Sequence, residues 1–138
     1  MTVVNEGAGA RAGRSRSDGA RETGPALEAH YRFILWLVPV VERFPRSQKF
    51  LLGDRLQATA LDVLEWLIEA TWTRQRAAHL ARANLGVERL RVLCRLAFDL
   101  RYLDRRRYEH ASRCLDDIGR RIGGWIRTHR GKKTSRSV

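Results

Sequence analysis

The 138-residue sequence lacks several features on which secreted, disulfide-bonded and membrane-spanning proteins depend. Its two cysteines, Cys94 and Cys114, lie 20 residues apart with no neighbouring ladder of Cys and His, so a disulfide scaffold is not expected and a reducing compartment suits them. The N-terminus has no apolar stretch of the length that a signal peptide requires, and no segment approaches the ~20 apolar residues of a membrane span. We therefore predict a cytoplasmic, soluble protein with no membrane partner.

The sequence also lacks the motifs of common catalytic and metal centres. The four histidines (His30, His79, His110 and His129) are scattered, with no HExxH motif, no Cys/His ligand spacing and no Glu-x-x-His pair of the di-iron bundles. Gly53 stands alone in its segment, so no glycine-rich loop is available to cradle a phosphate. His110 and Cys114 are four residues apart and share one side of a helix, but two groups without a third partner are weak evidence for a site. We predict a protein that is not an enzyme and that needs no metal or cofactor.

Positive charge is concentrated in the second half of the chain. Residues 74–138 carry 18 Lys and Arg against six Asp and Glu, whereas residues 1–73 carry nine of each. The formal net charge of +12 thus belongs to the second half. Such asymmetry indicates a polyanionic partner: nucleic acid first, and an acidic protein or a membrane surface second.

Hydrophobic periodicity divides the chain into a tail and four amphipathic helices. Residues 1–24 are rich in Gly, Ala, Arg and Ser and nearly lack large apolar side chains, so we expect a disordered tail. Apolar residues then recur at steps of three and four, which predicts helices over about residues 25–44, 47–72, 75–102 and 104–128. We expect Pro39 to kink the first helix, Ser47 to cap the second and Asp104 to cap the fourth.

Four such helices with short connections predict an all-α fold, an antiparallel up-down four-helix bundle over residues 25–130, followed by a basic flexible tail over residues 131–138. The residues expected to face its core are Leu27, Tyr31, Ile34, Val38 and Val41 in the first helix, Leu52, Leu56, Ala60, Val63, Leu67 and Ala70 in the second, Leu85, Leu93, Leu96, Ala97 and Leu100 in the third, and Tyr108, Ala111, Leu115, Ile118, Ile122 and Trp125 in the fourth.

The last predicted helix contains three glycines in an otherwise helical pattern. Glycine costs up to about 1 kcal/mol against alanine inside a helix. The apolar repeat nevertheless runs straight through Gly119, Gly123 and Gly124 to Trp125. Bare backbone on one side of this helix allows a close approach, either by another helix of the same bundle or by another subunit.

Arginines form a stripe on the last predicted helix. Arg106, Arg113, Arg120 and Arg127 are spaced by sevens and lie opposite the apolar residues of that helix. Arg91 and Arg95 are expected to face away from the apolar side of the preceding helix, and the acids Glu109, Asp116 and Asp117 are not expected to neutralise the stripe. Nearly all the basic residues are Arg, whose planar fork binds phosphate through two hydrogen bonds and stacks on bases.

This pattern favours nucleic acid over a merely solvated face. Trp36, Trp66 and Trp125 fall on or beside apolar faces and do not interleave with the basic residues, so the predicted binding is directed at the phosphate backbone and is sensitive to salt.

Three stretches together resemble a known family. ERFPRSQKFLLGDRL joins the first two predicted helices, ERLRVLCRLAFDL lies in the third, and LDDIGRRIGGWIRTHRGKK closes the fourth. Their order and spacing over about residues 26–131 resemble the accessory variability determinant (Avd) family of diversity-generating retroelements. They also resemble related four-helix-bundle proteins encoded in intervening sequences of bacterial 23S ribosomal RNA genes.

The resemblance implies a non-catalytic protein that assembles as a pentameric barrel. It further implies binding to the retroelement's reverse transcriptase and to nucleic acid, with template RNA first, which enables mutagenic cDNA synthesis. Gly119, Gly123, Gly124 and Trp125 match the family's last-helix motif, for which a packing or oligomer-interface role is implied. With the resemblance added, the residues expected to bind nucleic acid or reverse transcriptase are Arg91, Arg95, Arg106, Arg113, Arg120, Arg127, Arg130, Lys132 and Lys133.

Two other functions remain open from the sequence. One is a ribosomal-RNA-linked bundle protein of unknown role, and the other is an interaction module whose basic face meets an acidic protein. The charge asymmetry disfavours the latter without excluding it.

Overall fold

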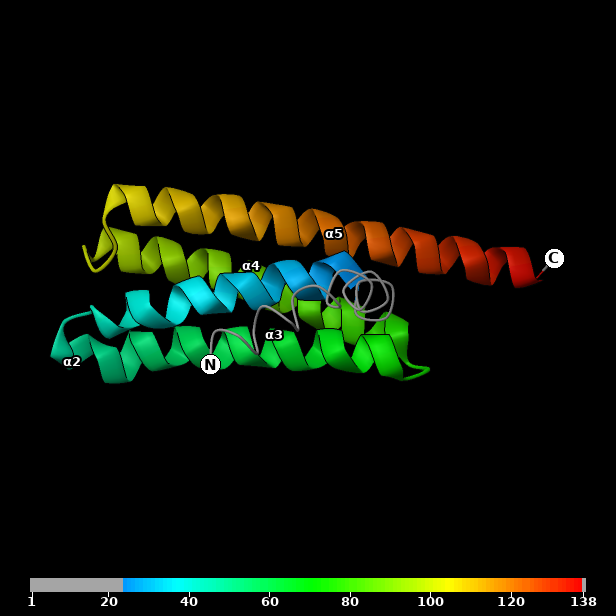
Figure 1. Cartoon of the computed structure of the whole chain (residues 1–138), viewed down its shortest axis with the longest axis horizontal. Helices are drawn as coiled ribbons and strands as arrows, with labels where there is room; N and C mark the ends of the chain where they lie inside the picture. The colour runs from blue at the N-terminus through cyan, green and yellow to red at the C-terminus, as the bar shows by residue number, and fades with distance from the viewer. Residues whose placement is uncertain (1–23, 138) are drawn as a thin grey trace, which may run out of the picture.

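Helices account for almost all of the chain that the structure describes. The computed structural model describes residues 24–137, with side chains described through residue 131. A first helix over residues 24–42 is followed by α2 (Arg46–Gln48), the π-helical turn η1 (Lys49–Gly53), α3 (Asp54–Trp72), α4 (Arg76–Asp99) and α5 (Arg105–Ser137) (Figure 1). Residues 24–137 contain no strand. The predicted N-terminal tail lies outside the described residues, apart from Gly24.

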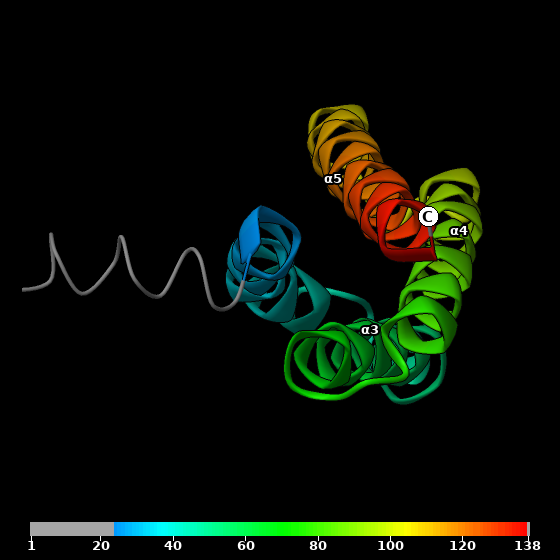
Figure 2. The same cartoon turned by 90° about the vertical axis from the view of Figure 1, so that its right-hand side faces the viewer.

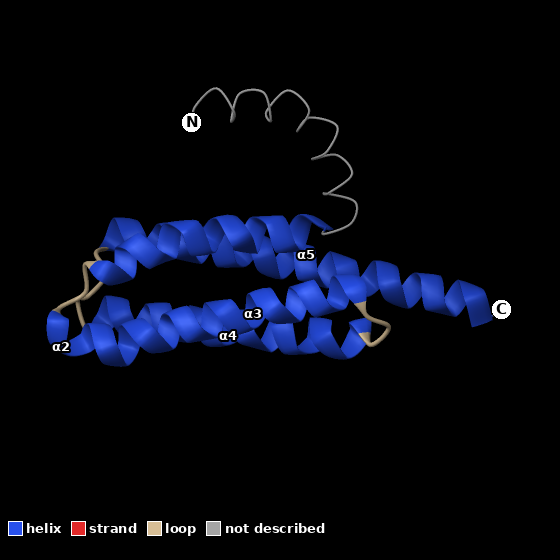
Figure 3. Ribbon diagram, turned by 60° about the horizontal axis from the view of Figure 1, so that its bottom comes forward, coloured by secondary structure: helices blue, strands red, loops and turns tan. Residues whose placement is uncertain are grey.

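The four long helices form the predicted antiparallel up-down bundle. Viewed along its axis, the first helix, α3, α4 and α5 follow one another around the bundle, so that the first helix and α4 lie diagonally opposite (Figure 2). The first helix contacts α3 where His30 Nε2 donates to the carbonyl of Ala60 at 2.8 Å, and it contacts α5 where the Trp36 and His110 rings lie 4.6 Å apart. Short loops join the helices at the two ends, and α5 extends beyond the others (Figure 3).

His30 is a buried polar side chain in this core. Its Nδ1 has no partner among the described residues, and burial lowers the pKa of the imidazole below its ordinary value of 6.5. The neutral tautomer with its proton on Nε2 satisfies the hydrogen bond to Ala60 without placing a charge in the core.

The predicted core faces of α3 and α5 are confirmed. All six predicted residues of α3 and its preceding turn are buried, and in α5 Ala111, Leu115, Ile118 and Ile122 are buried while Tyr108 and Trp125 are half-buried. In both helices the apolar repeat at steps of three and four is unbroken along the buried side, so the period identifies that side, although α3 also exposes Leu61, Ile68 and Trp72.

The predicted core faces of the first helix and α4 are only partly confirmed. In the first helix Leu27 and Val41 are buried as expected and Ile34 is half-buried, but Tyr31 and Val38 are exposed. Phe33, Leu37 and Val40 complete the core there, and in α4 Ala97 alone of the predicted residues is fully buried. In α4 the exposed residues include Leu85, Leu96 and Leu100, and Leu93 is half-buried. The buried residues of α4 are Leu80, Ala83, Gly86, Val87, Leu90, Cys94 and Ala97.

The physical reason is that both helices carry apolar residues on more than one side. Leucine and valine occur around most of α4, so a stripe of large residues does not single out the buried face. The small residues Ala83, Gly86 and Ala97 decide it, because they allow α4 to lie close to its neighbours.

The turn before α3 also differs from its prediction. Ser47 does not cap a helix: it is exposed within α2, and the carbonyl of Pro45 already accepts hydrogen bonds from the amides of Gln48 and Lys49, each at 2.9 Å. The helical turn therefore begins earlier than Ser47 and widens into η1 before α3 starts at Asp54. The first helix itself continues through Pro39 to residue 42.

Side chains explain where the other helices begin and end. Arg76 donates from Nε to the carbonyl of Ala70 at 2.7 Å and from Nη2 to that of Thr71 at 3.4 Å, so α3 ends at Trp72 without a glycine or proline. Asp104 caps α5 as predicted, since its carboxylate accepts from the amide of Arg107 at 2.8 Å.

The last helix ends later than expected. α5 continues to Ser137, beyond the predicted end at about Thr128 and through most of the segment predicted as a tail.

Close packing of α3 against α4 depends on Gly86. A Cβ atom at this position would lie 2.4 Å from Val63 Cγ2 and 3.3 Å from the Trp66 ring. The Val63 side chain is β-branched and has little rotamer freedom in a helix, so it cannot move aside cheaply. Gly86 is therefore a point of close approach between α3 and α4.

We predict that Gly86→Ala lowers the free energy of unfolding by about 1–2 kcal/mol, because overpacking of the contact with Val63 outweighs the gain in helix propensity. Urea unfolding followed by circular dichroism measures this change. Gly131→Ala is the matched control, since a Cβ at Gly131 in α5 meets nothing within 4 Å. It should leave stability unchanged or raise it by up to about 1 kcal/mol. A stabilising Gly86→Ala change would contradict the close-packing account.

Candidate nucleic-acid interface

The outer face of α5 carries the predicted arginine stripe. Arg106, Arg113, Arg120 and Arg127 are all exposed, as their spacing by sevens opposite the buried Leu115 and Ile118 predicts. Within the described part of the chain, no acidic side chain lies within ion-pair distance of Arg106, Arg113 or Arg127. Three guanidinium groups on this face are thus available to an outside anion.

Asp117 neutralises one member of the stripe, contrary to the sequence prediction. It pairs with Arg120 Nη2 at 3.0 Å and with Arg121 Nε at 2.8 Å. The hydrogen bond from Arg121 is the main reason that the pKa of Asp117 lies below its ordinary value. The sequence signal for this pair is its spacing, since an acid three or four residues from an arginine on a helix can reach it across one turn.

The Arg91 guanidinium is already paired with acidic side chains of this chain and is not a free cation. Its guanidinium pairs with Asp116 of α5 and with Glu88 of α4, and its Nη2 donates to the carbonyl of Leu115 at 3.4 Å. The hydrogen bond to Asp116 is the largest cause of the raised pKa of Arg91. Asp116 leaves the α5 stripe unpaired, as predicted, and instead links α5 to α4.

Arg95 and the C-terminal basic residues stand apart from Arg91. Arg95 is exposed and lies 3.8 Å from Asp99, one turn along the same helix. Arg130 is an exposed residue near the end of α5. Lys132 and Lys133 belong to α5 by their backbone, but their side chains lie outside the described residues.

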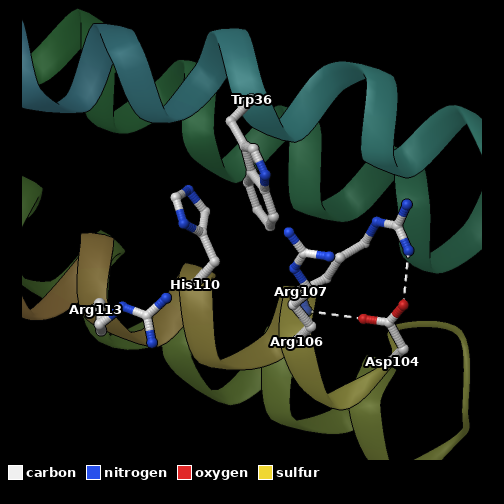
Figure 4. Close-up of a pocket in the computed structure, with 6 residues that line it drawn as sticks. All are labelled: Trp36, Asp104, Arg106, Arg107, His110 and Arg113. Carbon is white, nitrogen blue, oxygen red and sulfur yellow. Dashed lines mark hydrogen bonds and ion pairs between the residues drawn. The ribbon is translucent and has the colours of Figure 1, made fainter.

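A basic pocket lies between the first helix and the start of α5. Six residues line it, and we name it the Trp36 pocket: Trp36, Asp104, Arg106, Arg107, His110 and Arg113. It has a volume of about 500 Å³. Figure 4 shows the Trp36 ring reaching from the first helix toward α5, where His110 and the arginines stand.

Two of the predicted arginines, Arg106 and Arg113, are part of this pocket, whereas sequence reasoning missed Trp36, Arg107 and His110. Trp36 and His110 are 74 positions apart, and only the pairing of the first helix with α5 brings their rings together. The sequence signal that could have found them is the tryptophan on the edge of an apolar face, a position from which a ring reaches the surface.

His110 and Cys114 lie side by side on α5. Cys114 Sγ lies 3.4 Å from His110 Nε2, but burial raises the pKa of this thiol, so it stays protonated near neutral pH. Burial raises the pKa of Cys94 further, to about 12. Among the described residues, no group of three or more His, Cys, Asp or Glu side chains could hold a metal ion.

The glycines of α5 are open rather than packed. A Cβ at Gly119 would meet only the Arg91 guanidinium, at 3.1 Å, and at Gly123 or Gly124 it would meet only Arg127 of the same helix. The Arg91 side chain of α4 thus covers the backbone at Gly119, whereas at Gly123 and Gly124 no other helix within the described residues comes within 4 Å. Trp125 is half-buried, and the Arg76 guanidinium lies 5.8 Å from its ring centre.

A match to a family model identifies the chain. The model of the bAvd-like family matches residues 27–129, which run from the first helix through α3 and α4 and into α5. The chain therefore belongs to the bAvd-like family, in agreement with its resemblance to the accessory variability determinant family. No curated protein and no solved structure shows significant similarity to it. Within residues 24–137, no helix has both the length and the apolar character that crossing a bilayer requires.

We predict that Arg91→Gln destabilises the bundle, whereas Arg106→Gln does not. Arg91 joins α4 to α5 through half-exposed ion pairs, and the loss of such pairs costs about 0.5–1 kcal/mol. Arg106 is exposed and unpaired in the described part of the chain, so its removal should leave the free energy of unfolding within about 0.5 kcal/mol. Chemical unfolding of the two variants compares them, and equal stabilities would show that the Arg91 pairs contribute nothing.

Proposed function

We propose that this protein is the non-enzymatic accessory protein of a diversity-generating retroelement. In this role it binds the retroelement's reverse transcriptase and template RNA in the cytoplasm and enables mutagenic cDNA synthesis. Membership of the bAvd-like family over residues 27–129 is the observation that carries the proposal. An accessory role also fits the protonated thiols and the scattered histidines, which offer no activated nucleophile.

The exposed face of α5 supports RNA as one partner. Arg106, Arg113 and Arg127 present three guanidinium groups along one side of a long helix, and arginine binds phosphate through two parallel hydrogen bonds. Contacts of this kind are directed at the nucleic-acid backbone, so the affinity should fall steeply with salt. Arg130, Lys132 and Lys133 extend the same helix and belong to the proposed surface. Arg91 contributes through the position of α5 rather than by direct contact, because its guanidinium is already paired.

Two exposed apolar faces support a homo-oligomer. One lies along the seam of the first helix and α3: His30 contacts Ala60 across the seam, and the next residues, Tyr31 and Leu61, are exposed. The exposed large apolar residues on this side are Tyr31, Leu35, Val38, Leu61, Ile68 and Trp72.

The second face is on α4, diagonally opposite the first helix (Figure 2). Val92 is 65% exposed and stands about 200° around the helix from the buried Leu90. The exposed apolar residues here are Leu85, Val92, Leu96 and Leu100. Two different exposed apolar faces on opposite sides of a subunit favour a head-to-tail contact between subunits. Repeated contacts of this kind form a ring when the rotation between neighbouring subunits closes. A pentameric ring is the form that we propose, from family membership.

Affinity capture of the tagged full chain from its own host, with and without nuclease, tests the proposal. We expect a reverse transcriptase to remain bound after nuclease treatment, together with a repeat-derived RNA that is lost on digestion. Recovery of ribosomal RNA and ribosomal proteins instead would contradict the retroelement role and favour the ribosomal-RNA-linked alternative.

The glycines of α5, with Trp125 beside them, are a further part of the proposed oligomer interface, in addition to the two apolar faces. We predict that Gly123→Leu lowers the oligomer mass measured by light scattering, since a branched side chain would fill the bare surface that a neighbouring subunit approaches. The monomer tolerates the change, because a Cβ at Gly123 meets only the Arg127 side chain at 3.5 Å. Gly131→Leu introduces the same side chain at another open glycine of α5 and should leave the mass unchanged. An unaltered mass for Gly123→Leu would remove Gly123 from the interface.

A further inference from the structure

We propose that the Trp36 pocket binds one unstacked nucleotide of a single-stranded RNA, with the base against the Trp36 and His110 rings and the flanking phosphates on Arg106 and Arg113. The inference rests on the proposed binding of RNA and adds a defined site to it. It also adds a contact with a base to a surface that otherwise offers only charge.

The aromatic side of the pocket is fixed before any ligand arrives. Trp36 stacks on Phe33 of the core, with ring centres 5.8 Å apart and planes 30° apart. The His110 ring also lies near Trp36, with ring centres 4.6 Å apart and planes 47° apart. Trp36 is only half-buried, so part of a ring held by the core faces the pocket. A base that packs against a ring already in place gains stacking energy with little loss of side-chain entropy.

The charged side of the pocket is strongly positive. Three arginines and one aspartate line it, and the aspartate is already engaged: Asp104 accepts from both the amide and the guanidinium of Arg107, at 2.8 and 2.7 Å. Arg106 and Arg113 have no partner within the described residues. An anion at this position therefore meets two unpaired guanidinium groups beside an aromatic pair.

The shape and chemistry favour a nucleotide of a single strand over other polyanions. A volume of about 500 Å³ is within the range of pockets that hold small ligands, so one nucleotide fits. A base in a duplex is stacked on both sides and cannot reach a ring between two helices, whereas the unstacked bases of single-stranded RNA can. An acidic peptide would satisfy the arginines but would bring no planar ring to Trp36.

The rest of α5 continues the path from the pocket. Arg113, Arg120 and Arg127 follow Arg106 at intervals of seven residues, about 10.5 Å along the helix. A strand whose base enters the pocket can therefore run along α5 with its phosphates on the exposed arginines. The pocket would fix the register of a strand that the stripe alone could hold anywhere.

Fluorescence anisotropy with the full-length protein tests the site. Three labelled probes are compared: a single-stranded RNA oligonucleotide, an abasic strand of equal length, and the same RNA in a duplex. We expect the single strand to bind about 5- to 150-fold more tightly than the abasic strand, the range expected for one base–aromatic stack. Trp36→Leu should remove this preference and leave the affinity for the abasic strand unchanged.

Matched variants separate stacking from charge. Phe50→Leu changes another aromatic side chain, one that is exposed in η1 and outside the proposed interfaces, and should leave all three affinities unchanged. Arg106→Gln and Arg113→Gln should each reduce the slope of log affinity against log salt by about 0.7 on the single strand, whereas Trp36→Leu should not alter the slope. If circular dichroism shows that Trp36→Leu loses helix, Trp36→Phe keeps a smaller ring on Phe33 and should weaken binding of the RNA strand but not of the abasic strand.

The outcomes distinguish the two proposals. A wild-type protein that binds none of the probes would overturn RNA binding itself. The pocket would be overturned, and the accessory role left standing, if the wild-type protein bound RNA with no preference over the abasic strand or if the Trp36 variants bound as Phe50→Leu does. Displacement of the strand by a free mononucleotide near the strand's own Kd would assign the pocket to a small ligand instead.

Discussion

The close contact of α3 with α4 at Gly86 is the constraint on which the rest of the bundle depends. Because no Cβ intervenes between the α4 backbone and Val63, the side of α4 that carries Gly86 approaches α3 closely, and Leu85, Leu96 and Leu100 face outward. This rotation places Arg91 against Asp116 and so fixes where α5 lies. The position of α5 then decides which arginines face solvent and brings His110 to Trp36. The basic surface is thus set by a contact on the far side of the bundle.

The sequence predicts the fold well, and it predicts the burial of α3 and α5 because an unbroken apolar repeat runs the length of each helix. It fails for α4 because Leu85, Leu96 and Leu100 compete with a buried face that includes the small residues Ala83, Gly86 and Ala97, and large side chains dominate the periodicity. The number and order of the helices are predicted correctly even where the buried face is not, because they depend only on where the periodic segments start and stop. The orientation of a helix with two apolar sides depends on tertiary contacts, which no local pattern encodes.

The same distinction holds for the candidate interface. The arginine stripe follows from spacing within one helix, and the structure bears out its exposure. Of the ion pairs at this site, the one between Asp117 and Arg120 lies within one helix and is allowed by the spacing, whereas the one between Arg91 and Asp116 joins two helices and follows from no local spacing. The Trp36 pocket depends on residues from the first helix and α5, so it is visible only once those helices are paired. Local features of the site are predictable, whereas features shared between helices are not.

Arg76 connects three helices with one side chain. It binds the terminal carbonyls of α3, stands at the start of α4, and lies over the Trp125 ring of α5. The hairpin of α3 and α4 can close by contacts near in sequence, but the guanidinium reaches its full set of neighbours only after α5 docks. Completion of the short turn and arrival of the last helix are therefore energetically coupled. In terms of folding, this end of the bundle should open and close as one cooperative unit, so that α5 and its arginines do not detach while the α3–α4 turn stays intact.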